Sequence, residues 1–168
     1  MTPEQIVDEL ARNTPDRRPT MTRISNEGQP EDVAAALGVA ATTPFVRMLL
    51  CDLLGQMRAA TTIDALLTAL SDTDSRVRAA AADAAGKVFG YVDEPLGPAT
   101  RDRVRQTLEE RIAVEDSDAV LSTLMQTAAL LGDPSVRPLL ESRLDHPDRR
   151  VRRQAAWGLD YLARKSSG

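Results

Sequence analysis

The chain has 168 residues, which is enough for one domain or a small repeat array. Hydrophobic residues make up 42% of it but aromatic residues only 3%, so few large side chains are available to anchor a β-sandwich or β-barrel. The net charge of −4 argues against a chain that binds a polyanion over its whole surface, because nucleic-acid-binding domains usually carry a basic excess.

The number of cysteines and the N-terminal residues indicate in which cellular compartment the protein is expected. Cys51 is the only cysteine, which excludes a disulfide framework or a thiolate metal cluster within one chain, and we predict neither a metal nor a cofactor. Residues 1–13 contain four charged side chains and no long apolar run, so neither a secretory signal nor a membrane span is predicted. We therefore expect a cytoplasmic protein.

Residues 1–30 are predicted to form an N-terminal capping helix followed by an irregular segment. Thr2 and Pro3 begin the helix, because Pro is favoured at the first helical position, and Glu4 suits the first turn. Residues 16–19 read Asp-Arg-Arg-Pro and echo the Asp-Arg-Arg-Val of residues 148–151. Since Pro stands in the place of the valine, we interpret residues 1–30 as a degenerate cap repeat in which 19–30 are largely irregular.

Beyond residue 30 the sequence repeats. Four aligned valines lie 31, 43 and 31 residues apart: Val46, Val77, Val120 and Val151. Three residues before each valine stands a favoured helix N-cap: Thr43, Asp74, Ser117 and Asp148. Small or apolar residues follow at four, seven, eight and eleven positions after the valines, which is the spacing of one helical stripe. The pattern predicts amphipathic helices over 46–57, 77–88, 120–131 and 151–162.

A second helix is predicted before each of these. The partner helices are expected over 31–41, 60–71, 99–114 and 134–144, joined to the valine helices by short polar turns. One such pair cannot bury its apolar stripe alone, so the pairs must stack. The expected array covers 31–168, with repeats at about 31–58, 60–90, 99–132 and 134–165. Gly90 to Pro98 contains two glycines and two prolines and is predicted to be an exposed loop.

These residues resemble the HEAT-repeat family, in particular its short bacterial form. The resemblance is carried by Asp-Ser-Arg-Val-Arg at 74–78, by Asp-Arg-Arg-Val-Arg at 148–152, and by the paired alanines that follow each motif. Leu-Gly-Asp-Pro at 131–134 looks like the family's link between repeats. The resemblance implies an all-α, right-handed α-solenoid of about four HEAT-like helix pairs with an N-terminal capping helix.

Candidate catalytic groups are few. His146 is the only histidine and is predicted to be a solvated turn residue, with pH sensing as the alternative. No catalytic residue is predicted, and we expect the chain not to be an enzyme. The arginines that follow three of the valines are expected to pair with acids of neighbouring turns, such as Asp72, Asp74 or Asp145. These arginines are Arg47, Arg78 and Arg152.

A partner-binding face is predicted on the valine helices. In a HEAT-like array these helices line the concave surface, so positions two, six and ten after each valine should face a partner. The predicted binding residues are Met48, Asp52, Gln56, Asp83, Lys87, Gln126, Arg153, Trp157, Tyr161 and Arg164. The surface changes from acidic and polar to aromatic and basic, and Trp157 is either an interface anchor or a cap over the end of the last repeat.

Three functions are compatible with this pattern. The leading hypothesis is a protein-interaction module, such as a scaffold, regulator or inhibitor, that binds another protein and no membrane. The second is a nucleic-acid binder that uses the arginine-rich last repeat, whose affinity should fall steeply with salt. The third is a lyase or chaperone-like accessory protein, because the phycobilin lyases share short HEAT-like repeats.

Overall fold

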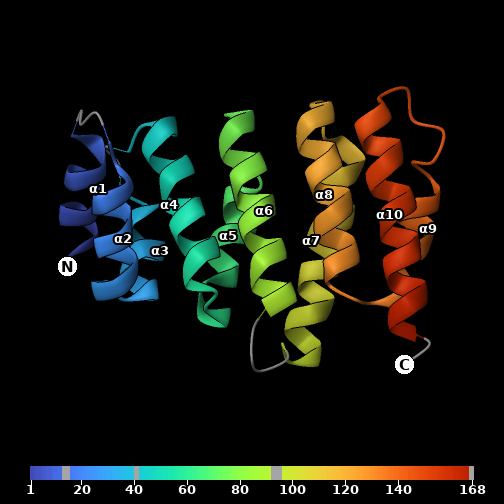
Figure 1. Cartoon of the computed structure of the whole chain (residues 1–168), viewed down its shortest axis with the longest axis horizontal. Helices are drawn as coiled ribbons and strands as arrows, with labels where there is room; N and C mark the ends of the chain where they lie inside the picture. Colours follow the sequence, from blue (N-terminus) through green and yellow to red (C-terminus); the bar gives the residue numbers. More distant parts are fainter. Residues whose placement is uncertain (13–15, 40–41, 92–95, 167–168) are drawn as a thin grey trace. The chain divides into compact units, whose positions relative to one another are not determined.

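A computed structural model describes residues 1–12, 16–39, 42–91 and 96–166, and every regular element in these ranges is a helix. The chain divides into two compact units, Met1–Val88 and Phe89–Gly168, each built from packed helices (Figure 1). None of the helices in the described ranges is both long enough and apolar enough to span a bilayer.

The N-terminal unit pairs short helices with longer ones. In chain order it contains α1 (Pro3–Ala11), α2 (Arg18–Glu27), α3 (Pro30–Ala36), α4 (Pro44–Met57), the 3-10 turn η1 (Ala60–Thr62), α5 (Ile63–Ala69) and most of α6 (Ser75–Tyr91). Helix α1 packs on both α2 and α3, and all three pack on α4. Their shared core includes the fully buried Ile6, Leu10, Ile24 and Val33.

Helix α2 corrects the prediction that residues 19–30 are irregular. Pro19 lies in the first turn of the helix, where the missing N–H would have no helical acceptor anyway. Asp16 accepts a hydrogen bond from the Arg18 amide at 3.0 Å, and Ile24 is buried against the neighbouring helices. Gly28 ends the helix, its amide donating to the Ile24 carbonyl at 2.8 Å. The N-terminal cap is therefore two helices.

The C-terminal unit also consists of helix pairs. It contains the last turn of α6, then α7 (Pro98–Val114), α8 (Asp118–Leu130), the 3-10 turn η2 (Pro134–Val136), α9 (Arg137–Glu141) and α10 (Arg149–Ser166). Helix α8 packs against both α7 and α10, and α9 packs against α10 (Figure 1). Gly158 permits a close approach, because a Cβ there would lie 3.0 Å from both the Ala129 Cβ and the Leu140 Cδ1.

The predicted valine helices are present as α4, α6, α8 and α10. All four aligned valines are buried, as are the small residues on the same helical stripe, such as Ala81 and Ala84. Three of the partner helices are shorter than predicted, whereas α7 (Pro98–Val114) matches the helix predicted over 99–114. Helix α3 ends at Ala36 because Leu37 and Gly38 turn the chain, and residues 40 and 41 of the expected helix lie outside the described ranges. The segments 60–71 and 134–144 each begin as a 3-10 turn and leave the helix at Ala69 and Glu141.

The predicted loop between Gly90 and Pro98 is also shorter than expected. Helix α6 continues through Gly90 to Tyr91, and α7 starts with Pro98. A Cβ on Gly90 would meet only the Leu130 Cδ2 at 3.7 Å, so this glycine marks neither a turn nor a close approach. Residues 92–95 lie outside the described ranges.

Three of the four predicted N-caps make the expected contact. The Thr43 hydroxyl accepts from the Val46 amide, and Asp74 and Asp148 accept from backbone amides of the first turns of α6 and α10. The side-chain hydrogen bond from Arg150 lowers the pKa of Asp148 to about 2. Ser117 is the exception, because its side chain makes no cap hydrogen bond and its own amide donates to the Glu115 carboxylate at 3.0 Å.

Candidate functional site

The ten predicted binding residues divide equally between the two units. Those of the N-terminal unit are Met48, Asp52 and Gln56 on α4 with Asp83 and Lys87 on α6. Those of the C-terminal unit are Gln126 on α8 with Arg153, Trp157, Tyr161 and Arg164 on α10. Each set is therefore a separate candidate surface, and a single surface shared by all ten residues stays a prediction.

The first set contains a compact group of charges. Lys87 Nζ lies 2.6 Å from Asp83 Oδ2, one helical turn away on α6. Asp52 on α4 is partly buried, and this burial raises its pKa while the nearby Lys87 acts in the opposite direction. The three side chains meet because Gly55 brings α4 against α6, where a Cβ on Gly55 would lie 2.9 Å from the Ala84 Cα. The two carboxylates outnumber the one ammonium group, so this surface keeps a net negative charge.

The second set contains a pair of stacked aromatic rings. Trp157 and Tyr161, one turn apart on α10, have ring centroids 5.3 Å apart and an interplanar angle of 25°. The Lys165 Nζ lies 5.7 Å from the Tyr161 ring centroid. Both rings are partly buried, whereas Arg153 and Arg164 are exposed.

The buried stripe of α10 explains this placement. Val151, Ala155, Gly158 and Leu162 face the core of the C-terminal unit, and Trp157 stands beside that stripe. The ring is therefore neither fully exposed nor sealed within the core. Its stacking on Tyr161 fixes its orientation at the edge of the packed face.

The basic residues of the last repeat fall into two groups. Several are held by the protein itself: Arg143 donates to the Ile112 carbonyl, Arg150 pairs with Asp148, and Arg152 donates to the carbonyls of His146 and Pro147. Others make no ion pair with any residue of the described ranges: Arg149, Arg153 and Arg164. Within the last repeat, the cations that are free to meet a ligand thus lie on α10.

Within the described ranges, the predicted pairing of aspartates with the arginines that follow the valines is seen at Arg47. Arg47 donates from Nε and Nη2 to the two carboxylate oxygens of Asp72, at 2.7 and 3.0 Å. Arg78 donates to the carbonyls of Asp72 and Thr73. Arg152 likewise bonds to carbonyls of the preceding turn, so its expected pairing with Asp145 is wrong. The cause is geometric, since an arginine in the first turn of a helix lies directly above the carbonyls of the turn that enters it.

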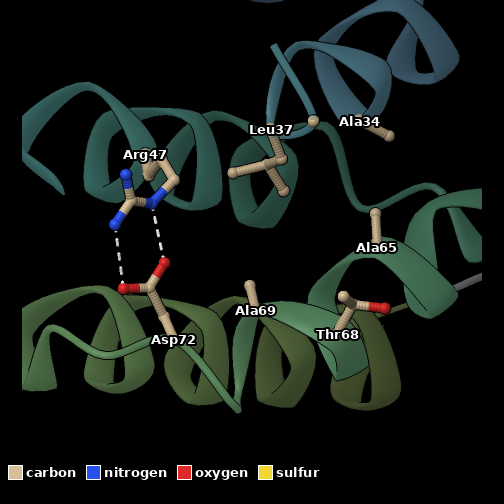
Figure 2. Close-up of a pocket in the computed structure, with 8 residues that line it drawn as sticks. Ala34, Leu37, Arg47, Ala65, Thr68, Ala69 and Asp72 are labelled. Carbon is tan, nitrogen blue, oxygen red and sulfur yellow. Dashed lines mark hydrogen bonds and ion pairs between the residues drawn. The ribbon is translucent and has the colours of Figure 1, made fainter. Parts of the chain in front are cut away.

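A pocket that the sequence did not predict lies between α3 and α5 (Figure 2). Its volume is about 250 Å³, and it is lined by Ala34, Leu37, Gly38, Arg47, Ala65, Thr68, Ala69 and Asp72. The Arg47–Asp72 ion pair stands at one end, and small apolar side chains form the walls. The pocket is smaller than most small-molecule sites. Its only sequence signal is the alanines on two neighbouring short helices.

The candidate reactive residues have structural roles. Cys51 is buried, and its desolvation raises the pKa of the thiol to about 12. The His146 Nδ1 accepts from the Asp148 amide at 3.2 Å and the ring is partly buried, so the prediction of a solvated turn histidine is wrong. Among the residues that the structure describes, no group of three or more His, Cys, Asp or Glu side chains is placed to hold a metal ion.

Comparison with known proteins agrees with this all-helical architecture. A family model described as HEAT repeats matches residues 35–127, more than half of the chain, and the chain belongs to the HEAT-repeat family. The predicted fold class is thereby confirmed. A search of curated proteins gave no significant match.

A solved structure with a similar fold is the complex of CpcE and CpcF of phycocyanin lyase from Nostoc sp. PCC7120. The two match with a TM-score of 0.67 over 99% of this chain and 67% of that chain, at 18% sequence identity. At this identity the likeness concerns the fold alone.

Proposed function

We propose that this chain is a protein-interaction module that binds a partner protein through the face of α10 that contains Trp157 and Tyr161, with Trp157 as the anchor. The observation that carries the proposal is the stacked pair of Trp157 and Tyr161 between the exposed arginines Arg153 and Arg164. Trp, Tyr and Arg are the residues most enriched among interface hot spots. HEAT repeats are generally protein-interaction scaffolds, and the similar solved structure is itself a complex of two proteins.

The geometry supports an anchor role. The ring of Trp157 is already oriented by Tyr161, and α10 is fixed by its buried stripe, so little conformational entropy remains to be lost on binding. The partly buried edge of the pair offers an apolar surface, and the flanking guanidinium groups offer charge. Such a centre with a polar rim is typical of protein interfaces.

The proposal is tested by affinity purification from the native organism with three forms of the chain: wild type, Trp157→Ala and Phe45→Ala. Phe45 is the matched control, because it is an aromatic side chain of the N-terminal unit that is 40% exposed and contacts the Arg17 guanidinium. We expect one protein to be recovered with wild type and Phe45→Ala but lost with Trp157→Ala. With that protein purified, Trp157→Ala should weaken binding about thirtyfold.

Thermal unfolding separates loss of the interface from loss of the fold. The two variants should keep unfolding midpoints close to that of wild type. If Trp157→Ala unfolds at a much lower temperature yet binds normally per folded molecule, then Trp157 is a cap of the core and the anchor assignment is wrong. In that case the affinity of Arg153→Gln for the partner, measured because Arg153 is exposed, shows whether any part of this face binds the partner.

A further inference from the structure

Charge is distributed unevenly along the chain. Helix α10 contains six basic residues and one acid: Arg149, Arg150, Arg152, Arg153, Arg164 and Lys165 with Asp160. Its net charge is therefore +5 in a chain whose total is −4, which leaves −9 for all other residues. One helix thus has the opposite sign to the rest of the chain.

The free cations of α10 surround the aromatic pair. Arg153 precedes Trp157 by one turn, and Arg164 follows Tyr161 by one turn, so the two arginines are separated by about 16 Å along the helix axis. Lys165 extends over the Tyr161 ring. In contrast, Arg150 and Arg152 are held by Asp148 and by backbone carbonyls. The available positive charge therefore coincides with the proposed anchor.

We infer that the partner presents an acidic protein segment to this face, with carboxylates placed against Arg153 and Arg164 and an apolar side chain placed against the Trp157–Tyr161 pair. This inference rests on the proposed function and adds the chemistry of its ligand. Arginine can bind a carboxylate through two parallel hydrogen bonds, which fixes orientation as well as adding affinity. Opposite charge also speeds encounter between the two surfaces.

An acidic protein segment fits this surface better than a nucleic acid does. A duplex carries one phosphate charge per roughly 1.7 Å of helix axis, whereas the free cations here are few and are confined to one helix. The excess of nine negative charges elsewhere repels a long polyanion. The Tyr161 ring already contacts Trp157 and Lys165, so a stacked base would have to compete with these two side chains for it.

The test uses defined probes. A fluorescein-labelled short peptide of alternating Glu and Leu residues is titrated with the chain, beside the same peptide with Gln in place of Glu and a single-stranded oligothymidylate. The key variant is Arg153→Gln/Arg164→Gln. Its matched control is Arg12→Gln/Arg137→Gln, which removes the same charge from exposed residues that lie outside α10.

We expect the Glu–Leu peptide to bind wild type and the control variant alike. Binding should weaken about tenfold both in the key variant and with the Gln–Leu peptide, because each exposed charge pair contributes a few-fold. Raising the salt concentration from about 0.05 to 0.5 M should weaken it further. Equal binding of the Glu and Gln peptides, absence of binding by both, or tighter binding of the oligothymidylate would each overturn the inference.

The same titrations distinguish this inference from the proposed function. If Trp157→Ala weakens binding of the recovered partner while Arg153→Gln/Arg164→Gln does not, the anchor stands and the acidic ligand is wrong. If Trp157→Ala leaves every affinity unchanged while the arginine variant lowers them, the anchor is wrong and the acidic ligand stands.

Discussion

Asp72 connects the first turn of α4 to the turn that enters α6. Its carboxylate accepts from Arg47 Nε and Nη2 and from the Asp74 amide, while its carbonyl accepts from Arg78. The side-chain hydrogen bond from Arg47 lowers the pKa of Asp72. Because the Arg47 side chain is only 20% exposed and that of Asp72 only 12%, the pair is shielded from solvent more than most surface ion pairs.

This pair makes stability depend on pH. Asp72→Asn keeps an oxygen for the Asp74 amide but removes the charge, and we expect it to lower the free energy of unfolding at pH 7 by about 1–2 kcal/mol. The folded-state pKa is lowered, so the contribution is present above the ordinary aspartate pKa and is lost as the pH falls through the lowered value. Urea unfolding at a series of pH values should show the two proteins converging below about pH 4. If the difference in the free energy of unfolding between wild type and Asp72→Asn does not change with pH, the charge of Asp72 is unimportant for stability.

At the residue scale, sequence reasoning succeeded where both partners of a contact are side chains. The position of Arg47 directly after an aligned valine predicted a contact with an acid of a neighbouring turn, and Asp72 is that acid. The carbonyl bonds of Arg152 were not predictable, because every residue of the preceding turn has a carbonyl and its direction depends on backbone geometry. The Arg47–Asp72 end of the pocket could be predicted in part, but its volume could not.

Among the helices, the long second members of the pairs were the easiest to predict. Their buried stripes contain an aligned valine and small residues at helical spacing, so the repeat register supports each of them independently. Helix α2 was missed although residues 16–19 echo the motif that begins α10. Asp16 in fact bonds the Arg18 amide just as Asp148 bonds the Arg150 amide. Pro19 in the place of the valine was interpreted as the sign of a degenerate repeat, but proline is compatible with the first turn of a helix.

The close packing of α4 on α6 gives a prediction about glycine. A Cβ on Gly55 would lie 2.9 Å from the Ala84 Cα and 3.1 Å from its Cβ, so backbone must move. We expect Gly55→Ala to destabilise the chain by about 1–3 kcal/mol even though alanine favours helix. Gly90→Ala is the control: its Cβ has room, and it should be neutral or stabilise by up to about 1 kcal/mol. Chemical denaturation measures both, and equal effects would mean that α4 and α6 are not in close contact.

Helix starts give a second prediction at this scale. Thr43 and Ser117 occupy equivalent N-cap positions, but only the Thr43 hydroxyl accepts a hydrogen bond from its helix. Thr43→Ala should therefore cost about 1 kcal/mol, and Ser117→Ala should cost less than about 0.5 kcal/mol. Thermal unfolding of the two variants checks this difference. Equal destabilisation would show that Ser117 caps α8 in solution.

Over the whole molecule, the repeat pattern predicted an all-helical array and its family but could not predict how the chain divides into two compact units at the end of α6. The periodicity of the sequence indicates which residues are buried within a repeat, whereas the boundary between the two units depends on contacts between repeats. The same limit applies to the candidate site. Sequence spacing placed Trp157 and Tyr161 on one helical face, while their stacking depends on side-chain conformations.

We propose that the chain functions by binding a protein at Trp157. Trp157 is the only tryptophan in the sequence, so chain produced with fluorotryptophan has one fluorine NMR resonance that reports on this site alone. On titration with the protein recovered by affinity purification, we predict that this resonance shifts or broadens and that the change saturates together with binding. If that protein binds and the Trp157 resonance stays unchanged throughout the titration, the interface lies elsewhere on the chain and the claim is wrong.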